Sequence, residues 1–311
     1  MRFLLVSFLL IVSMVGLSCN RGGNQDSSSM RIALVLKTLN SPFFVDLRNG
    51  AQTAADSAGV KLIVQAPERE IDVEKQMQII ENLIQIQVDA ICVTPSGSRE
   101  LIPALLKANK ANIPVLIVDT KLDQETAKKA GVKTETFIGS DNYEGGRIAG
   151  KRMAELFDGQ ANLAVIEGIP GHETGDSRLQ GFRDGIKDFP GLKIIASQPA
   201  NWERDQSYNV MQNILQAHPE IQAVFGCNDV MALGAMEAIA SMSVSNKIKI
   251  IGFDAINEAK DEILKGNMDA SIAQHPGEMG RLAVLNAIRV VNGEKIPTYI
   301  TVKIELITKS D

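Results

Sequence analysis

The sequence has little cysteine, little histidine and few aromatic residues, and it carries no run of basic residues. Its three cysteines lie far apart along 311 residues, which is a poor basis for a disulfide framework or a cysteine-based metal site. Cys92 and Cys227 stand in apolar, strand-like runs, AICV and VFGC, so we expect two buried free thiols. A net charge of −5 without clusters of lysine and arginine argues against nucleic-acid binding.

Motifs of enzymes that use nucleotides or metals are missing too. No G-x-G-x-x-G follows a strand-like run and no G-x-x-x-x-G-K-[ST] occurs, so nucleotide phosphates have no glycine-rich cradle. The glycine-rich GIPGHETG has neither spacing. The histidines at 172, 218 and 275 are far apart and stand in no H-E-x-x-H or triad-like pattern. We therefore expect a protein that is not an enzyme and that needs no cofactor or metal.

Residues 1–18 are predicted to be an export signal, because a positive charge precedes an apolar run over residues 3–15 and small residues follow it. The run is shorter than the roughly 20 apolar residues that span a bilayer. Cys19 comes next, where bacterial lipoproteins carry their lipid, and residues 19–30 have the polar composition of a flexible tether. Gly16 replaces the leucine usual in such signals, so simple secretion with cleavage nearby stays an alternative. Either route predicts a place in the periplasm or on the outer face of the cell envelope.

From residue 31 onward, short apolar runs alternate with amphipathic segments. RIALVLK at residues 31–37 is strand-like, and residues 42–58 form a predicted helix with a serine before it and a glycine after it. The strand-like runs are nearly continuous valine, isoleucine and leucine, so both of their faces should be buried. This alternation predicts an α/β fold with a parallel sheet covered on both sides. The pattern restarts after residue 140, which predicts two similar doubly wound lobes.

Polar side chains stand where the predicted strands end. In an open parallel sheet, ligands bind beyond the carboxyl ends of the strands. The residues at these places are Lys37, Thr94, Asp119, Glu167, Asn228, Asp254 and Gln274. Any single aspartate or asparagine among them could simply cap the next helix. Together they give both lobes side chains that can form hydrogen bonds with hydroxyl groups.

The few aromatic residues support the same site. Phe43 and Phe44 are adjacent at the start of a predicted helix, so only one ring can point into the core with Leu47. Trp202 lies in the polar loop QPANWERD directly after a strand-like run. Aromatic rings can cover the apolar faces of a pyranose, while the forked guanidinium of Arg178 can donate to its hydroxyls. We therefore predict a binding site for a sugar ring.

These residues, in this order, resemble the type I periplasmic binding proteins for sugars, and most closely the ribose- and allose-binding proteins. The resemblance runs from IALVLKTLNSPFFVDLRNGAQ through ANIPVLIVDT and GSDNYEGGRIAG to ASIAQHP. It implies sugar contacts at Phe43, Phe44, Asp119, Arg178, Trp202, Asn228, Asp254 and Gln274, and Lys37 matches a lysine of the allose binders. The chain departs from the ribose binders at three further site positions, which hold Ser41, Thr94 and Thr120. The sugar could thus be a related pentose, ketohexose or sugar alcohol.

The resemblance also implies a division of the chain and a set of partners. Residues 31–140 and 275–303 would form the N-terminal lobe, and residues 141–274 and 304–311 the C-terminal lobe, joined by a hinge of three segments. The protein would be a monomer that captures a monosaccharide and delivers it to the permease subunits of an ABC transporter. A chemoreceptor is a further candidate partner, and contact with the membrane is expected only through a lipid on Cys19.

Two alternatives use the same fold. The effector-binding half of a repressor of the lac type needs a helix-turn-helix ahead of residue 31, and an export signal is predicted there instead. A receptor for another small polyol or a furanose-like signal stays open, because it would differ only in the residues of the cleft.

Overall fold

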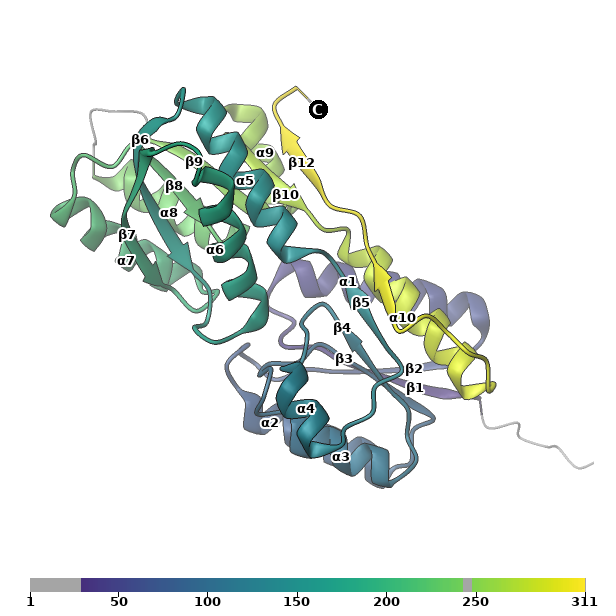
Figure 1. The fold of residues 1–311 in the computed structure, drawn as a ribbon. Helices are drawn as coiled ribbons and strands as arrows, with labels where there is room; N and C mark the ends of the chain where they lie inside the picture. The colour runs from purple at the N-terminus through teal and green to yellow at the C-terminus, as the bar shows by residue number, and fades with distance from the viewer. Residues whose placement is uncertain (1–28, 243–247, 311) are drawn as a thin grey trace, which may run out of the picture.

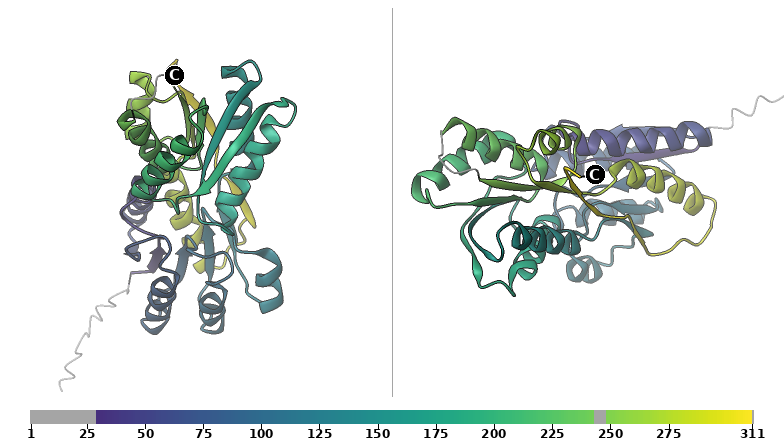
Figure 2. Two further views of the ribbon diagram at one scale, coloured as in Figure 1. Left: turned by 90° about the vertical axis from the view of Figure 1, so that its left-hand side faces the viewer. Right: turned by 90° about the horizontal axis from the view of Figure 1, so that it is seen from above.

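The computed structural model describes residues 29–242 and 248–310. The predicted export signal, Cys19 and most of the predicted tether lie outside the described residues. Figures 1 and 2 show an elongated molecule with one sheet toward each end. Within the described part of the chain, no helix is both long enough and apolar enough to cross a membrane.

The first sheet is parallel throughout and has the strand order β11-β5-β4-β3-β1-β2. Its strands are β1 (Arg31–Val35), β2 (Lys61–Gln65), β3 (Ala90–Val93), β4 (Val115–Val118), β5 (Thr136–Gly139) and β11 (Tyr299–Thr301). The helices around it are α1 (Pro42–Ala58), α2 (Val73–Gln85), α3 (Ile102–Lys110), α4 (Gln124–Ala130) and α10 (Pro276–Val291). Alternate residues of β1 point to opposite faces: Ile32 and Leu34 join the core under α1 and α10, and Ala33 and Val35 join the core over α2 and α3.

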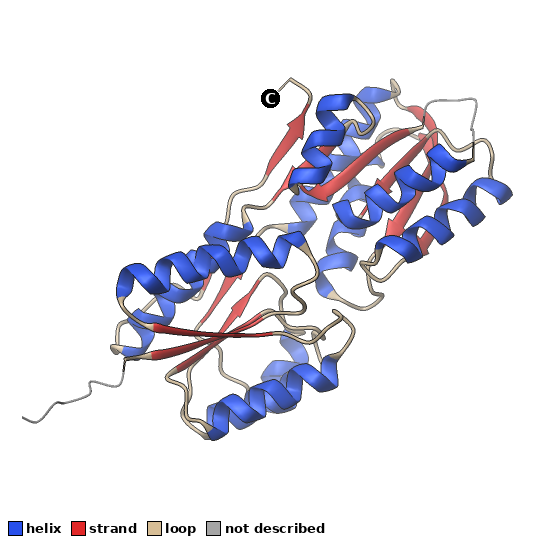
Figure 3. Cartoon of the chain, turned by 180° about the vertical axis from the view of Figure 1, so that it is seen from behind, coloured by secondary structure: helices blue, strands red, loops and turns tan. Residues whose placement is uncertain are grey.

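The second sheet has the order β12-β10-β9-β8-β6-β7. Its strands are β6 (Gln160–Glu167), β7 (Gly191–Pro199), β8 (Ala223–Gly226), β9 (Lys249–Asp254), β10 (Ala270–Ala273) and β12 (Glu305–Thr308). The helices around it are α5 (Asn142–Leu156), α6 (Glu173–Ile186), α7 (Arg204–Ala217), α8 (Asp229–Ser241) and α9 (Asn257–Lys265). Figure 3 shows helices on both faces of each sheet. The predicted fold, two similar doubly wound lobes, is confirmed.

One strand departs from the predicted parallel pattern. β12 pairs with β10 in antiparallel register. The reason lies in the connection, because β11 ends at the carboxyl edge of the first sheet and only residues 302–304 separate it from β12. The chain therefore enters the second sheet from its carboxyl edge and runs against the neighbouring strand.

The chain passes between the two sheets three times, from β5 to α5, from β10 to α10 and from β11 to β12 (Figure 1). Residues 140–141, 274–275 and 302–304 make these passages. His275 has a φ of 55°, so the second passage turns sharply before Pro276 begins α10. The division of the chain into lobes that move about these segments stays a prediction.

The predicted free thiols are confirmed for the described cysteines. Cys92 and Cys227 are buried and unpaired. Burial raises the pKa of each thiol to about 12, so both are protonated at neutral pH.

Helices α1 and α10 approach each other so closely that glycine is needed between them. A Cβ placed on Gly280 would lie 1.9 Å from the carbonyl oxygen of Leu47. The Cβ is attached directly to the backbone of α10 and the oxygen belongs to the backbone of α1. A side-chain rotation therefore cannot remove the clash. Gly280 therefore sets the distance between α1, which carries Phe43 and Phe44, and the helix that begins at a hinge passage.

We expect Gly280→Ala to destabilise the protein by about 1–3 kcal/mol, because the added methyl group forces α1 and α10 apart. Urea unfolding followed by circular dichroism measures the change. Gly277→Ala is the matched control in the same helix, since a Cβ there would lie 3.7 Å from its nearest neighbour, the carbonyl oxygen of Asp46. An equal loss of stability in both variants would contradict this account of the helix contact.

Candidate functional site

The carboxyl ends of the two sheets face each other across a small cavity. Its walls come from both lobes and consist of Lys37, Ser41, Phe43, Phe44, Glu70, Asp119, Thr174, Arg178, Trp202, Asn228, Asp254 and Gln274. Ten of these twelve were predicted from the sequence. The loops that follow β1, β2 and β4, together with the start of α1, supply the first lobe's side chains, as expected for a parallel sheet.

The first lobe's aromatic wall is built at the start of α1. Ser41 is the N-cap residue, in extended conformation, but its side chain makes no capping hydrogen bond, so the hydroxyl is left to the cavity wall. The rings of Phe43 and Phe44 meet edge to face, with centroids 5.2 Å apart and planes at 88°. We predicted that one ring would join the core and the other would cover a ligand. Instead, both rings are buried in the core and both line the cavity.

Lys37 and Asp119 place opposite charges beside these rings. The Lys37 ammonium lies 3.5 Å from an Asp119 carboxylate oxygen, 3.8 Å from a Glu70 carboxylate oxygen and 5.7 Å from the centre of the Phe44 ring. Asp119 follows β4 with a φ of 64°, a left-handed conformation that turns the chain sharply at the strand's end. Its carboxylate also accepts a hydrogen bond of 2.9 Å from Thr120.

Arg178 is the centre of the second lobe's wall. It is 3% exposed, and its guanidinium donates to the side-chain oxygen of Asn142 at 2.9 Å and to the carbonyl oxygen of Cys227 at 2.7 Å. One of its nitrogens lies 3.5 Å from an Asp254 carboxylate oxygen. The guanidinium also stacks 3.8 Å above the centre of the Phe253 ring. These contacts hold a buried cation in one orientation, with its remaining donors free for a ligand.

Asp254 and Gln274 complete the polar part of this wall. Gln274 donates to the Asp254 carboxylate at 2.6 Å, and the amide oxygen of Gln274 is buried without a hydrogen-bond partner among the described residues. Burial raises the pKa of Asp254 to about 7, although Arg178 and Gln274 act in the opposite direction. An unpaired buried amide oxygen is costly, so a ligand hydroxyl that donates to it would add stability.

Trp202 is the aromatic residue that the second lobe contributes to the cavity wall. The residue is 7% exposed and has a φ of 67°. A Cβ on Gly168 would lie 2.1 Å from the indole ring, so a glycine there is what lets the ring lie against the loop after β6. The indole N–H has no partner within the described part of the protein.

Two predicted ligand residues do not reach the cavity wall. Thr94 is fully buried, and its hydroxyl lies 3.4 Å from the carbonyl oxygen of Val35. The Thr120 hydroxyl bonds to Asp119 and lies 3.0 Å from the hydroxyl of Thr174 in the other lobe. Both threonines therefore contact groups next to or in the wall and do not line the cavity themselves.

Two wall residues were missed from the sequence. Glu70 lies in the loop between β2 and α2, in the charged stretch PEREID, which looks like an ordinary solvated loop. Its position after β2 could have identified Glu70 as a wall residue, because ligands bind beyond the carboxyl ends of parallel strands. Thr174 lies in the first turn of α6, within the glycine-rich stretch GIPGHETG that matched no phosphate-binding motif.

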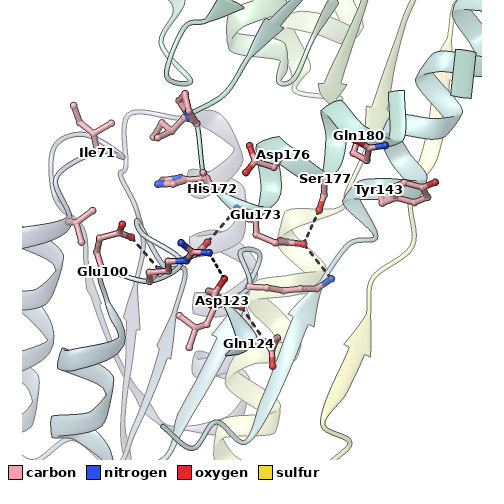
Figure 4. Close-up of a pocket in the computed structure, with 18 residues that line it drawn as sticks. Ile71, Glu100, Asp123, Gln124, Tyr143, His172, Glu173, Asp176, Ser177 and Gln180 are labelled. Atoms are coloured by element: carbon pink, nitrogen blue, oxygen red, sulfur yellow. Dashed lines mark hydrogen bonds and ion pairs between the residues drawn. The ribbon is translucent and has the colours of Figure 1, made fainter. Parts of the chain in front are cut away.

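A flank of the cleft holds further contacts between the lobes. The backbone N–H of Glu173 lies 3.4 Å from the hydroxyl of Ser98, and Lys121 lies 3.6 Å from the Glu173 carboxylate. Figure 4 shows this flank, with Glu173 also accepting a hydrogen bond from Ser177. Arg69 and Glu203 make another ion pair between the lobes at 3.5 Å. The two lobes are thus in a closed arrangement around the cavity.

The comparisons with known proteins agree with this geometry. The model of the family described as "Periplasmic binding protein domain" matches residues 32–295. The chain belongs to this family. It is 37% identical over 278 residues to the ribose import binding protein of Bacillus subtilis, covering 89% of this chain and 87% of the relative. It is 32% identical to the D-allose-binding periplasmic protein of Escherichia coli, covering 89% and 91%.

Solved structures of such binding proteins share the fold. An ABC transporter periplasmic solute-binding protein from Actinobacillus succinogenes, solved with bound D-allose, has a TM-score of 0.86 and 38% identity, covering 90% of this chain and 98% of that one. A solute-binding protein from Agrobacterium vitis with bound tagatopyranose has a TM-score of 0.85 and 30% identity, covering 90% and 95%. The predicted family resemblance is confirmed.

One buried side chain on α2 positions the loops of the first lobe's wall. The Gln76 amide donates to the carbonyl oxygens of Leu36 and Thr94 at 3.0 and 2.9 Å, and it accepts from the backbone N–H of Ser96 at 2.8 Å. It thereby joins the loop that carries Lys37 to the loop after β3. Gln76 is fully buried, so water cannot replace these bonds.

We expect Gln76→Leu to lower the free energy of unfolding by about 3 kcal/mol, because it leaves three buried backbone groups without partners. Gln78→Leu is the control on the same helix, since Gln78 is exposed, and it should change stability by less than about 0.5 kcal/mol. Denaturant midpoints of the two variants test this. Equal midpoints would show that Gln76 does not hold these loops together.

Proposed function

We propose that this protein captures a neutral monosaccharide, an aldose or ketose of the ribose or allose kind, between its lobes and delivers it to an ABC-type permease. One observation carries the proposal. Aromatic rings, buried cations and buried carboxyl groups from both lobes line one small cavity. The relatives named for import of ribose and binding of allose support the class of ligand. As a solute-binding protein, it would hold its ligand without changing it.

The chemistry of the wall suits a sugar. Phe43, Phe44 and Trp202 offer apolar surface for C–H faces at low cost in conformational entropy. The charged groups Asp119, Arg178 and Asp254 give shorter and stronger hydrogen bonds to hydroxyls than neutral groups would. A cyclic polyol is a second candidate, because a related solute-binding protein of Bacillus halodurans was solved with bound myo-inositol, at 26% identity and a TM-score of 0.84.

Capture would work by closing the lobes. Lys37 and Asp119 belong to one lobe, and Arg178 and Asp254 to the other, so a ligand that touches all four is complete only in the closed arrangement. Moving the equilibrium from 1:99 to 99:1 needs a difference in binding of about 5.5 kcal/mol. A few charge-assisted hydrogen bonds and the buried rings can supply it. The three passages between the sheets would act as the hinge, with residues 31–140 and 275–303 moving against residues 141–274 and 304–311.

The place of action and the partners follow from the family and the N-terminal sequence. Family membership implies a location outside the cytoplasm, and we propose that a lipid on Cys19 holds the protein at the membrane while residues 20–30 serve as a tether. The closed pair of lobes would present its surface to the permease, and a chemoreceptor is a further candidate for the same surface. We propose that the protein acts as a monomer.

The first test is a thermal-shift and fluorescence screen of the purified protein against pentoses, hexoses, ketoses and polyols. The matching sugar should change the fluorescence of Trp202, the single tryptophan, and at 1,000 times the dissociation constant it should add about 4 kcal/mol of stability. A parallel nucleotide panel should give no response.

We expect Arg178→Ala to abolish both responses, since it removes the donors that Asp254 and the ligand share. Arg183→Ala is the control, because Arg183 is exposed on the same helix. Unchanged sugar binding in Arg178→Ala would remove Arg178 from the site.

A further inference from the structure

The cavity has an excess of negative charge. Five ionisable side chains line it: the carboxyl groups of Glu70, Asp119 and Asp254, and the cations Lys37 and Arg178. If every group carried its usual charge, the wall would have a net charge of −1. A neutral sugar brings no charge to balance this, and a closed cavity excludes the water that would otherwise solvate it.

The negative charges of the three carboxyl groups are not equally stabilised by their neighbours. Asp119 has Lys37 at 3.5 Å and a hydrogen bond from Thr120. Asp254 has Arg178 at 3.5 Å and a hydrogen bond from Gln274. Glu70 has no hydrogen bond within the described residues, and its nearest cation is the Lys37 ammonium at 3.8 Å, which Asp119 shares. Glu70 is therefore the carboxyl group with the least stabilised charge.

The surroundings of Glu70 come from both lobes. Its side chain is 12% exposed, and burial raises its pKa from 4.5 to about 7. Lys37 lowers the pKa, while Asp119 from the same lobe and Asp254 and Glu203 from the other lobe raise it. When the lobes separate, Asp254 and Glu203 move away and water reaches the carboxyl group, so its pKa should return toward the ordinary value.

We propose that Glu70 takes up one proton from solvent when the lobes close on a neutral sugar, so that the closed wall around the sugar carries no net charge. This rests on the proposed function. A protonated Glu70 donates one hydrogen bond to a sugar oxygen and accepts others from hydroxyls. A sugar acid would return a net negative charge to this closed wall, beside the carboxylates of Asp119 and Asp254, so neutral sugars are preferred over anionic ones.

The direction of the pH dependence follows from proton linkage. In the open protein the pKa of Glu70 should return toward the ordinary value of 4.5, whereas in the closed structure burial raises it to about 7. The closed complex therefore binds more protons than the open protein at a pH between these values. Sugar affinity is therefore highest at acidic pH, falls by up to about tenfold per pH unit across this window, and levels off above it.

The test is titration calorimetry of the purified full chain with D-ribose and D-allose, in buffers of different ionisation enthalpy. At pH 6 we expect uptake of most of one proton per sugar bound. Between pH 5.5 and 7.5 we expect the affinity to fall by at least about tenfold. D-Glucuronate should fail to bind. The count of protons needs no variant, so it is independent of any change in folding.

Two matched variants assign the proton. Glu70→Gln should abolish proton uptake and make the affinity independent of pH to within about twofold, because the amide cannot titrate in this range. Glu203→Gln is the control, since Glu203 also acts on Glu70 but pairs with Arg69 at the rim. It should keep the proton uptake, with only a small shift of the pH window to lower pH, because Glu203 is the weakest of the groups that raise the pKa of Glu70. Melting temperatures of both variants check their folding.

Several outcomes would overturn the proposal. Sugar binding without proton uptake, or uptake that persists in Glu70→Gln and so belongs to Asp254, would remove this role from Glu70. Tighter binding of glucosamine than of the neutral sugars would make Glu70 a counter-ion for an ammonium group. If no neutral sugar of the wider panel binds at any pH, the proposed function itself fails, which is a different result from binding that lacks a proton.

Discussion

The cavity depends on one buried cation. Arg178 stands on α6, but its contacts come from the start of α5, the end of β8 and the end of β9, where Asn142, the Cys227 carbonyl and Asp254 receive its donors. Removing a guanidinium from water is expensive unless each donor finds an acceptor. The position of Arg178 is therefore fixed by one helix and two strand ends of the second lobe, and Arg178 in turn holds Asp254 in place. A ligand meets a wall whose polar groups are already oriented, so little entropy is lost in ordering them.

The same logic explains how the two lobes share the ligand. The first lobe carries Lys37 between two carboxyl groups, and the second lobe carries Arg178 beside a third. The second lobe's pair is thus neutral and the first lobe's group carries a charge of −1, which water can solvate when the cleft is open. Closure brings Glu70 close to Asp254 and Glu203 of the other lobe, and burial between the lobes raises the pKa of Glu70 to about 7. The negative charge of the wall is solvated in the open state. In the closed state it disfavours a ligand that brings a further negative charge.

The sequence was enough to predict the fold and most of the cavity wall, because the alternation of strands and helices and the residues at strand ends follow simple rules for parallel sheets. Lys37, Asp119 and Asn228 were found in this way. The antiparallel β12 was missed because its direction depends on a passage between the lobes that leaves no local pattern. Glu70 was missed since its loop has the composition of a solvated turn. The supporting role of Gln76 depends on backbone groups of two segments that are far apart in the sequence, the loops after β1 and β3. Contacts of this kind exist only after the chain has folded.

Backbone strain gives a last reason to assign function to this cavity. Asp119, Trp202 and Asp254 line it with φ values of 64°, 67° and 114°, in a region that side chains other than glycine rarely adopt. Each such conformation costs of order 1–3 kcal/mol and persists only where the surrounding structure enforces it. Glycine at these positions would relieve the strain, yet it would also remove the carboxylates and the indole ring. A fold that needed only stability would have no use for strained, partly unsatisfied side chains at the end of each sheet. Their convergence on one cavity is explained if a ligand completes their hydrogen bonds.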